Sequence, residues 1–168
     1  MSRGWKKLRS LAGYLLLLLA VITAIDIWRS QDIVAGTKTL GTLTTLDGQV
    51  LDLTALSEQQ PVLVYVWASW CGVCRWVSPM VSLAARQLPV VGIAVTSGPE
   101  EKLTAYVDKH RLKFAVVNDG QARLARTLGI GVTPTLMVAS HGKLDYITTG
   151  FTTLPGMFLR IWLAHIGN

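Results

Sequence analysis

Hydrophobic residues are most concentrated near the amino terminus, between Ser10 and Trp28 (SLAGYLLLLLAVITAIDIW). These nineteen residues contain one acidic residue, Asp26, and no basic residue. As an α-helix that rises about 1.5 Å per residue, the segment would be roughly 28 Å long, close to the ~30 Å hydrocarbon core of a bilayer. The pattern therefore predicts a transmembrane anchor over residues 10–28.

The charges that flank this segment are unequal. Residues 1–9 carry four basic residues and no acidic residue, whereas Arg29 follows the segment beside Asp26 and Asp32. By the positive-inside rule, the amino terminus is predicted to stay in the cytoplasm and everything after the segment to be exported. A cleaved signal peptide would need small residues one and three positions before the cut, and Val21 to Gly36 offers no convincing pair. We therefore expect an uncleaved, single-pass anchor.

Shorter hydrophobic runs follow the anchor. Residues 29–39 are polar and lack periodicity, which indicates a tether. The stretch GTLTTLDGQVLDL then places two short runs around Asp47-Gly48, a dipeptide that favours a tight hairpin turn. Pro61 to Ala68 (PVLVYVWA) is a continuous apolar run, as expected for a strand that is buried on both faces of a sheet.

Strand and helix patterns then alternate to the end of the chain. Residues 74–88 have apolar positions at three- and four-residue spacing, which predicts a helix with one apolar face. The other predicted elements are a strand at 89–95, a helix at 99–110, a strand at 114–117, a helix at 121–128, strands at 135–139 and 144–149, and a helix at 154–165. This order predicts one α/β sandwich domain with a mixed central sheet over residues 40–168.

The formal net charge of +6 is no evidence for a nucleic-acid partner, because part of it belongs to the four basic residues before the predicted anchor. Residues 29–168 hold twelve Lys and Arg against nine Asp and Glu, a net charge of +3. They contain no basic cluster beyond short pairs, so the sequence argues against nucleic-acid binding.

Two cysteines, Cys71 and Cys74, are the candidate chemistry, and they follow a predicted buried strand at the start of a predicted helix. Cysteines three residues apart on a helix lie about one turn apart, within the ~4.4–6.8 Å Cα separation that a disulfide tolerates. The helix N-terminus stabilises an anion and lowers a thiol pKa, so Cys71 is the predicted attacking thiolate. Cys74, one turn into the helix, is the predicted resolving thiol.

Two other uses of the pair are less well supported. A structural bridge across three residues closes almost no loop and removes little unfolded-state entropy, and a domain of this size does not need it. A zinc site needs more ligands than the pair supplies, because His110, His141 and His165 stand far apart in the sequence. We therefore expect these histidines to be surface or turn residues and expect no metal site.

The residues around the pair carry a resemblance. WCGVC directly after PVLVYVWAS, with Pro134 in GVTPTLMV sixty residues beyond Cys74, is similar to the thioredoxin superfamily. The amino-terminal anchor, the leading hairpin and the additional strand-helix unit between Val91 and the Pro134 strand resemble its membrane-tethered extracytoplasmic branch, the TlpA/ResA/CcmG-like proteins. Within that branch the chain resembles the suppressor-of-copper-sensitivity thioredoxin-like group. The match covers residues 40–166.

The resemblance implies a thioredoxin-like sandwich and a set of site residues. Cys71 and Cys74 match the attacking and resolving cysteines, and Pro134 matches a cis-proline that abuts the active site. Thr133 would offer backbone hydrogen bonds to an extended substrate segment. With them we expect substrate to contact Trp70, Gly72 and Val73. Trp67 and Trp76, by contrast, are expected to be core or packing residues.

Three positions near the pair bear on its chemistry. Thioredoxin has a buried acid beneath the cysteines where this chain has Tyr65, and some tethered relatives have a glutamate where this chain has Val77. Proton transfer at Cys74 would then depend on water or on the Tyr65 phenol. Arg75 is expected either to add positive potential that favours a thiolate or to be a solvated residue of the first turn.

The resemblance implies a thiol-disulfide oxidoreductase in a bacterial inner membrane with its domain in the periplasm. It would reduce disulfides of extracytoplasmic partner proteins, draw electrons from an integral-membrane thiol donor, and use no cofactor beyond the cysteine pair. Two alternatives stay open. A disulfide-introducing oxidase would use the same residues, and a copper- or haem-binding module would use the pair as ligands, because two thiolates suit Cu(I).

Overall fold

A computed structural model of the protein describes residues 13–14, 17, 37–38 and 41–166, and the chain divides into two compact units, Met1–Gln31 and Asp32–Asn168. Gly13, Tyr14 and Leu17 are helical, and most of the predicted anchor lies outside the described residues. None of the helices seen in the described ranges is both long and apolar enough to cross a membrane.

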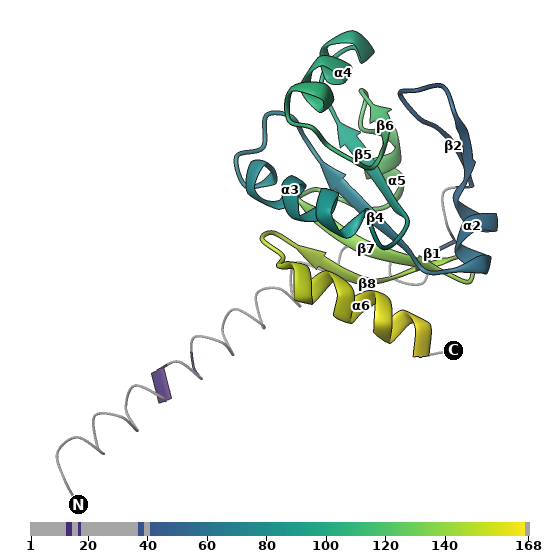
Figure 1. The fold of residues 1–168 in the computed structure, drawn as a ribbon, viewed down its shortest axis with the longest axis vertical. Helices are drawn as coiled ribbons and strands as arrows, with labels where there is room; N and C mark the ends of the chain where they lie inside the picture. Colours follow the sequence, from purple (N-terminus) through teal and green to yellow (C-terminus); the bar gives the residue numbers. More distant parts are fainter. Residues whose placement is uncertain (1–12, 15–16, 18–36, 39–40, 167–168) are drawn as a thin grey trace, which may run out of the picture. The chain divides into compact units, whose positions relative to one another are not determined.

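The second unit is built on a mixed sheet (Figure 1). In the described part of the chain this sheet has six strands in the order β1-β8-β7-β4-β5-β6. Their bounds are β1 Thr37–Lys38, β4 Val62–Trp67, β5 Val90–Val95, β6 Ala115–Asp119, β7 Thr135–Ser140 and β8 Lys143–Thr149. The strands β4, β5 and β6 run parallel, whereas β7 is antiparallel to both β4 and β8, and β8 is antiparallel to β1. The predicted mixed sheet is confirmed.

The leading hairpin is also present, as a separate two-stranded sheet of β2 (Thr42–Thr44) and β3 (Val50–Asp52). At its turn the Thr45 hydroxyl donates a hydrogen bond to Asp47, which lowers the pKa of that carboxyl. Gly48 has a φ of 78°, a left-handed conformation that glycine adopts without steric cost. The Asp47-Gly48 signal was therefore read correctly.

Five helices complete the described fold. They are α2 Leu53–Gln59, α3 Cys74–Ala84, α4 Glu100–Lys109, α5 Arg123–Thr127 and α6 Leu154–Ile166. The expected extra strand-helix unit is present as β6 and α5. Among the helices, two features differ from the prediction. The α3 helix ends at Ala84 rather than at residue 88, and the short α2 helix was missed. Asp52 begins α2 by accepting a hydrogen bond from the Ala55 amide at 3.0 Å.

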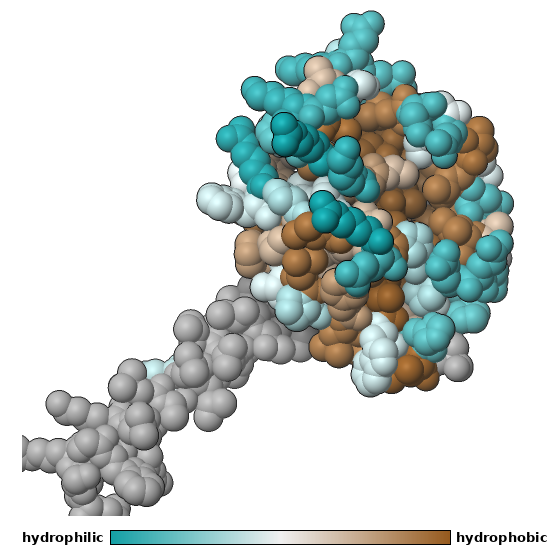
Figure 2. Space-filling view, viewed as in Figure 1, coloured by the Kyte–Doolittle hydropathy of each residue, from teal (hydrophilic) through white to brown (hydrophobic). Residues whose placement is uncertain are grey.

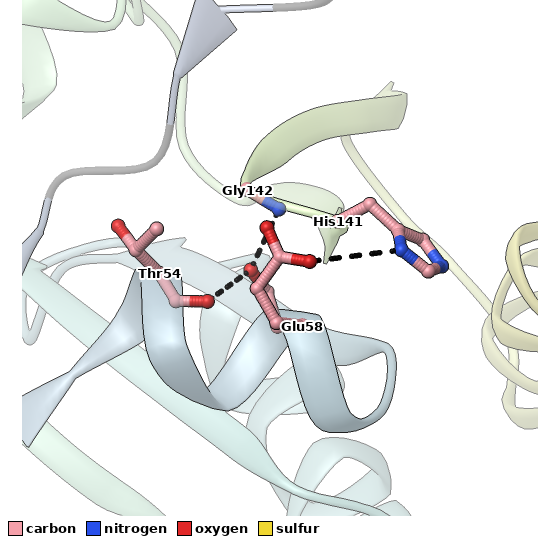
Figure 3. Close-up of polar contacts among 5 residues, drawn as sticks. Thr54, Glu58, His141 and Gly142 are labelled. Carbon is pink, nitrogen blue, oxygen red and sulfur yellow. Dashed lines mark hydrogen bonds and ion pairs between the residues drawn. The ribbon is translucent and has the colours of Figure 1, made fainter.

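The end of α2 is tied to the turn between β7 and β8 (Figure 3). The Gly142 amide donates to the Ser57 hydroxyl at 3.0 Å, and that hydroxyl donates to the Thr54 carbonyl at 2.8 Å. His141 Nδ1 lies 3.8 Å from a Glu58 carboxylate oxygen. His141 is thus an exposed turn residue, as expected.

Alternate residues of β4 point into two separate cores, because side chains alternate across a strand. Leu63, Tyr65 and Trp67 face a cluster with α3, α4 and α6. Val62, Val64 and Val66 face a cluster with the hairpin, α2 and α5. All six β4 residues are completely buried, so the sheet is covered on both faces. Figure 1 shows α3 and α6 side by side, and the two helices pack against each other.

One part of the predicted tether joins the sheet. Thr37 and Lys38, inside the range 29–39, form β1 and pair with Leu144 and Lys143 of β8. A two-residue edge strand has no periodicity of its own, so its pairing partner decides its conformation.

Candidate active site

The cysteine pair lies where β4 ends and α3 begins. The chain turns after Trp67, and the Cys71 amide donates to the Ala68 carbonyl at 3.2 Å. Cys74 is the first residue of α3. The two cysteines form a disulfide with a Cα separation of 5.2 Å, as the sequence spacing allows.

The two sulfur atoms have different surroundings. The Cys74 amide, one of the unpaired N–H groups of the first turn of α3, donates to Cys71 Sγ at 3.2 Å. The same N–H and the positive end of the helix dipole would stabilise a thiolate at Cys71. The exposed fraction is 7% for Cys71 and 1% for Cys74, so Cys71 is the one that an outside sulfur atom can approach. Arg75 is exposed at the next position.

A distant segment completes the site. The Thr133–Pro134 peptide bond is cis, which confirms the expectation for Pro134. The Thr133 carbonyl oxygen lies 3.6 Å from Cys71 Sγ. The two residues meet because β7, which begins directly after Pro134, pairs with β4 in a register that aligns Thr135 with Val66.

Exposed apolar side chains surround the pair. Trp70 is 62% exposed and is held by a hydrogen bond from its Nε1 to the Thr96 carbonyl at 3.2 Å. Val73 and Val132 are each 44% exposed. A depression beside Trp70 is lined by Val95, Thr96, Ala122, Ala125, Ile130, Gly131, Val132 and Thr133. Of the predicted substrate residues, Trp70, Gly72 and Val73 are exposed, Thr133 is half-buried and Pro134 is buried.

The prediction for the two other tryptophans near the pair is half right. Trp67 is completely buried, as expected for a core residue on a central strand. Trp76 is 76% exposed, which contradicts its assignment to the core. It lies on the outer side of the first turn of α3 and lines a second shallow depression with Gly72 and Arg75. Sequence spacing alone did not separate the buried Trp67, four residues before Cys71, from the exposed Trp76, five residues after it.

Beneath the pair the protein presents a hydroxyl pair rather than a carboxylate. The Tyr65 phenol and the Ser78 hydroxyl are both buried and lie 3.0 Å apart. Burial raises the pKa of the Tyr65 phenol well above its ordinary value, so the phenol stays protonated. Val77 is completely buried. Among the described residues Asp119 is the one buried acid, and its oxygens accept the Arg123 and Ala125 amides at the start of α5.

Sequence reasoning missed Thr96 and Ser97, which support the cysteine loop. The Ser97 hydroxyl accepts a hydrogen bond from the Ser69 amide at 2.9 Å and donates to the Val95 carbonyl at 3.1 Å. Thr96 has a φ of 44° and supplies the carbonyl that Trp70 binds. The signal was available, because the carboxyl ends of parallel strands such as β4 and β5 meet at one edge of a sheet.

Within the described residues no group of three or more His, Cys, Asp and Glu side chains is placed to hold a metal ion. His110 makes its contacts on α4, where its ring stacks on Tyr106 at a centroid distance of 4.0 Å. The cysteine pair therefore stands as a two-sulfur site without further side-chain ligands around it in this part of the chain.

The fold and the cysteine pair define a thioredoxin-like thiol-disulfide oxidoreductase. The chain belongs to the AhpC/TSA family, whose model matches residues 39–158. It is 37% identical over 160 residues to a thioredoxin-like protein of Haemophilus influenzae, an alignment that covers 95% of this chain and 96% of the relative. It is also 33% identical over 104 residues to a thiol:disulfide interchange protein DsbE homolog of Paracoccus denitrificans, covering 60% of this chain and 57% of the relative.

The solved structures agree on the fold. A secreted disulfide oxidoreductase of Mycobacterium tuberculosis, homologous to DsbE of E. coli, superposes with a TM-score of 0.58. The match covers 74% of this chain and 93% of that one at 21% sequence identity. At this level of identity the likeness concerns the arrangement of helices and strands, which is thioredoxin-like.

Proposed function

We propose that the protein is a membrane-tethered reductase of disulfides in extracytoplasmic proteins, with Cys71 as the attacking thiol and Cys74 as the resolving thiol. The observation that carries the proposal is the surroundings of Cys71 Sγ. This sulfur atom accepts a hydrogen bond from the Cys74 amide and lies beside the Thr133 carbonyl. The exposed Trp70 is the residue directly before Cys71 in the chain. A partner segment laid along Thr133 and Pro134 would bring its own disulfide to this sulfur.

In the reduced enzyme the Cys71 thiolate attacks one sulfur atom of the partner disulfide. A bond forms between Cys71 and that sulfur, and the second partner sulfur leaves as a thiolate that takes up a proton. The buried Cys74 then loses its proton and attacks Cys71 Sγ. The partner is released with two thiols, and the Cys71–Cys74 disulfide remains. Two electrons have passed to the partner, so an external thiol donor must return them.

Proton transfer at Cys74 has no nearby carboxylate among the described residues. Ser78 lies one helical turn after Cys74, on the same side of α3, and its hydroxyl meets the Tyr65 phenol. We expect this hydroxyl pair, with water, to handle the proton of the resolving thiol. We propose no cofactor beyond the cysteine pair.

The reductive direction and the location rest on separate support. The resemblance to the TlpA/ResA/CcmG-like branch favours reduction with electrons from an integral-membrane thiol donor. Anchoring is supported by the apolar segment 10–28. The alignment with the Haemophilus influenzae relative covers 95% of the chain and so takes in this segment. We place the domain on the outer side of a bacterial cytoplasmic membrane, and the resemblance to the copper-sensitivity group makes a copper-stress partner a candidate.

The test of the cysteine roles is a trapping experiment in cells. A Cys74→Ala variant should accumulate mixed disulfides between Cys71 and partner proteins, because nothing resolves them. The matched control is the Cys71→Ala, Cys74→Ala double variant, which removes the attacking sulfur and should trap nothing. A folded Cys74→Ala variant that forms no reducible adduct would contradict the proposed roles.

The direction is tested by the redox state of the pair in intact cells, after acid quench and thiol alkylation, with and without the membrane thiol donor. A reduced pair that becomes oxidised when the donor is deleted supports the reductase. A pair that is oxidised under both conditions indicates a disulfide-introducing oxidase. Free thiols that do not respond to the donor indicate metal or haem binding by the pair.

A further inference from the structure

The last helix, α6, is apolar on two opposite faces. Met157, Ile161 and Ala164 face the core. On the outer side, Leu159, Trp162 and Ile166 recur at three- and four-residue spacing with exposed fractions of 53%, 57% and 54%. A helix that covers a core normally has a polar outer face, so a second apolar stripe indicates contact with something other than water.

The charges of α6 also fit contact with something other than water. The helix contains no acidic residue, and its two basic side chains are Arg160 and His165. Figure 2 shows hydrophobic side chains interspersed with hydrophilic ones over α6, whereas hydrophilic side chains predominate over α4 at the opposite end of the domain. Phe151, 61% exposed, is a further exposed apolar side chain and lies three residues before the helix. An apolar face with a tryptophan, flanked by basic and not acidic groups, is the composition of helices that lie on lipid surfaces.

Few residues separate the proposed anchor from the domain. Residues 29–36 separate the apolar segment from β1, and eight residues can span at most about 30 Å. The strand β1 pairs with β8, and α6 packs on β8, where the Tyr146 hydroxyl donates to the Leu163 carbonyl at 3.3 Å. The chain therefore enters the domain at the edge of the sheet that α6 contacts.

We propose that the outer face of α6, formed by Leu159, Trp162 and Ile166 together with Phe151, lies on the lipid surface that holds the anchor. This inference rests on the proposed function in one respect, the membrane anchor, and is independent of the redox direction. It orients the catalytic site as well. The Gly150 amide donates to the Pro134 carbonyl at 2.7 Å, so the segment that leads into α6 is fixed to the cis-proline. A membrane-docked α6 would hold the cysteine pair close to the bilayer, where a membrane-embedded donor can reach it.

The experiment uses the full chain reconstituted into vesicles of phosphatidylethanolamine and phosphatidylglycerol. A photoreactive benzoylphenylalanine replaces Trp162, and in a control chain it replaces Val50, which is 71% exposed on the hairpin strand β3. Both sites are exposed, so the substitution should leave the fold and the disulfide-reducing activity intact, which is measured first. After illumination, lipid adducts are counted by mass spectrometry. We expect at least a tenfold higher lipid yield at position 162 than at position 50.

Each of the following results would overturn the proposal. Cross-links from position 162 to a second copy of the chain would indicate a dimer interface. Equal lipid yields at the two positions would indicate random contact. Membrane anchoring is tested separately, by asking whether the chain stays in the same vesicles after alkaline carbonate extraction. A chain that is extracted lacks the anchor, which overturns both proposals about the membrane, whereas a retained chain without adducts at 162 overturns the α6 proposal alone.

Discussion

The two faces of the central sheet differ in chemistry although one strand supplies both. On the face that packs against α2, α5 and the hairpin, the buried residues that the structure describes include no aromatic side chain and no cysteine. On the face that packs against α3, α4 and α6, they include Tyr65, Trp67 and both cysteines. The aliphatic face is purely a packing surface, whereas the aromatic face also positions the polar groups that surround the redox pair.

The aromatic side chains of the second face form a connected set. The Tyr65 and Trp67 rings are nearly parallel at a centroid distance of 6.3 Å, and Phe114 meets both edge-on at 5.8 and 6.2 Å. Such offset and edge-to-face pairs contribute beyond simple burial. They also fix the Tyr65 ring, and so the position of its hydroxyl beside Ser78. Rigid aromatic packing on this face therefore serves the site, and the comparison can be tested one substitution at a time.

The largest expected effect belongs to the aliphatic face. Leu53 is completely buried at the start of α2, and Leu53→Ala should lower the free energy of unfolding by about 2–5 kcal/mol through lost burial and a residual cavity. Disulfide exchange per folded molecule should stay unchanged, since the residue packs on the face away from the cysteines. Urea unfolding and an insulin-reduction assay measure the two quantities. The exposed Val50→Ala is the matched control, and a parallel loss of exchange rate in Leu53→Ala would mean that the faces are not independent.

An intermediate effect is expected at Gly92, where the aromatic set meets β5. A Cβ at this position would lie 2.5 Å from Phe114 Cε2 and 3.0 Å from Trp67 Nε1. Gly92→Ala should therefore cost about 1–3 kcal/mol, because ring and strand must shift. Thermal unfolding followed by near-UV circular dichroism would detect both the loss and the disturbed aromatic packing. Gly131→Ala, at a site with open space around the new methyl group, should have little effect on the aromatic signal.

The smallest expected effect at neutral pH belongs to the Tyr65 hydroxyl. Tyr65→Phe keeps the ring and removes one buried hydrogen bond to Ser78, which should cost about 1 kcal/mol. A double-mutant cycle with Ser78→Ala isolates the pair, because the double variant leaves neither hydroxyl unpaired. Additive losses in the cycle would show that the two hydroxyls do not interact.

The Tyr65→Phe variant should also differ from the natural chain at alkaline pH. Burial raises the pKa of Tyr65 in the folded state, while the unfolded phenol titrates near ~10. Below that pH the phenol is protonated in both the folded and the unfolded state, and its full contribution to the free energy of unfolding is present. Above it the unfolded state ionises first, so stability is lost as pH rises. Between pH 8 and 11 the free energy of unfolding should therefore fall more steeply with pH for the natural chain than for Tyr65→Phe. Equal slopes would contradict a buried, protonated phenol.

Much of the fold followed from local patterns in the sequence. The run from Pro61 to Ala68 and the apolar spacing after Cys74 predicted β4 and α3 because burial on two faces and on one face leave different periodicities. The Asp47-Gly48 turn has equally local causes. The short elements were missed for the opposite reason. Both α2 and β1 take their stability from contacts with distant strands, and seven or two residues carry little periodic signal.

The class of sheet and the pairing of Cys71 with Cys74 could be predicted from spacing and residue type, which are local properties of the chain. The place of Pro134 beside the pair was predicted from the resemblance to thioredoxin. The surroundings of the two sulfur atoms depend on long-range packing, and local sequence patterns did not predict them. The tertiary structure placed Thr133 against Cys71 across a pairing of β4 with β7 and joined the Tyr65 phenol to Ser78. It also turned Trp67 inward and Trp76 outward. These outcomes depend on strand register and helix rotation, which are set by the packing of residues far apart in the chain.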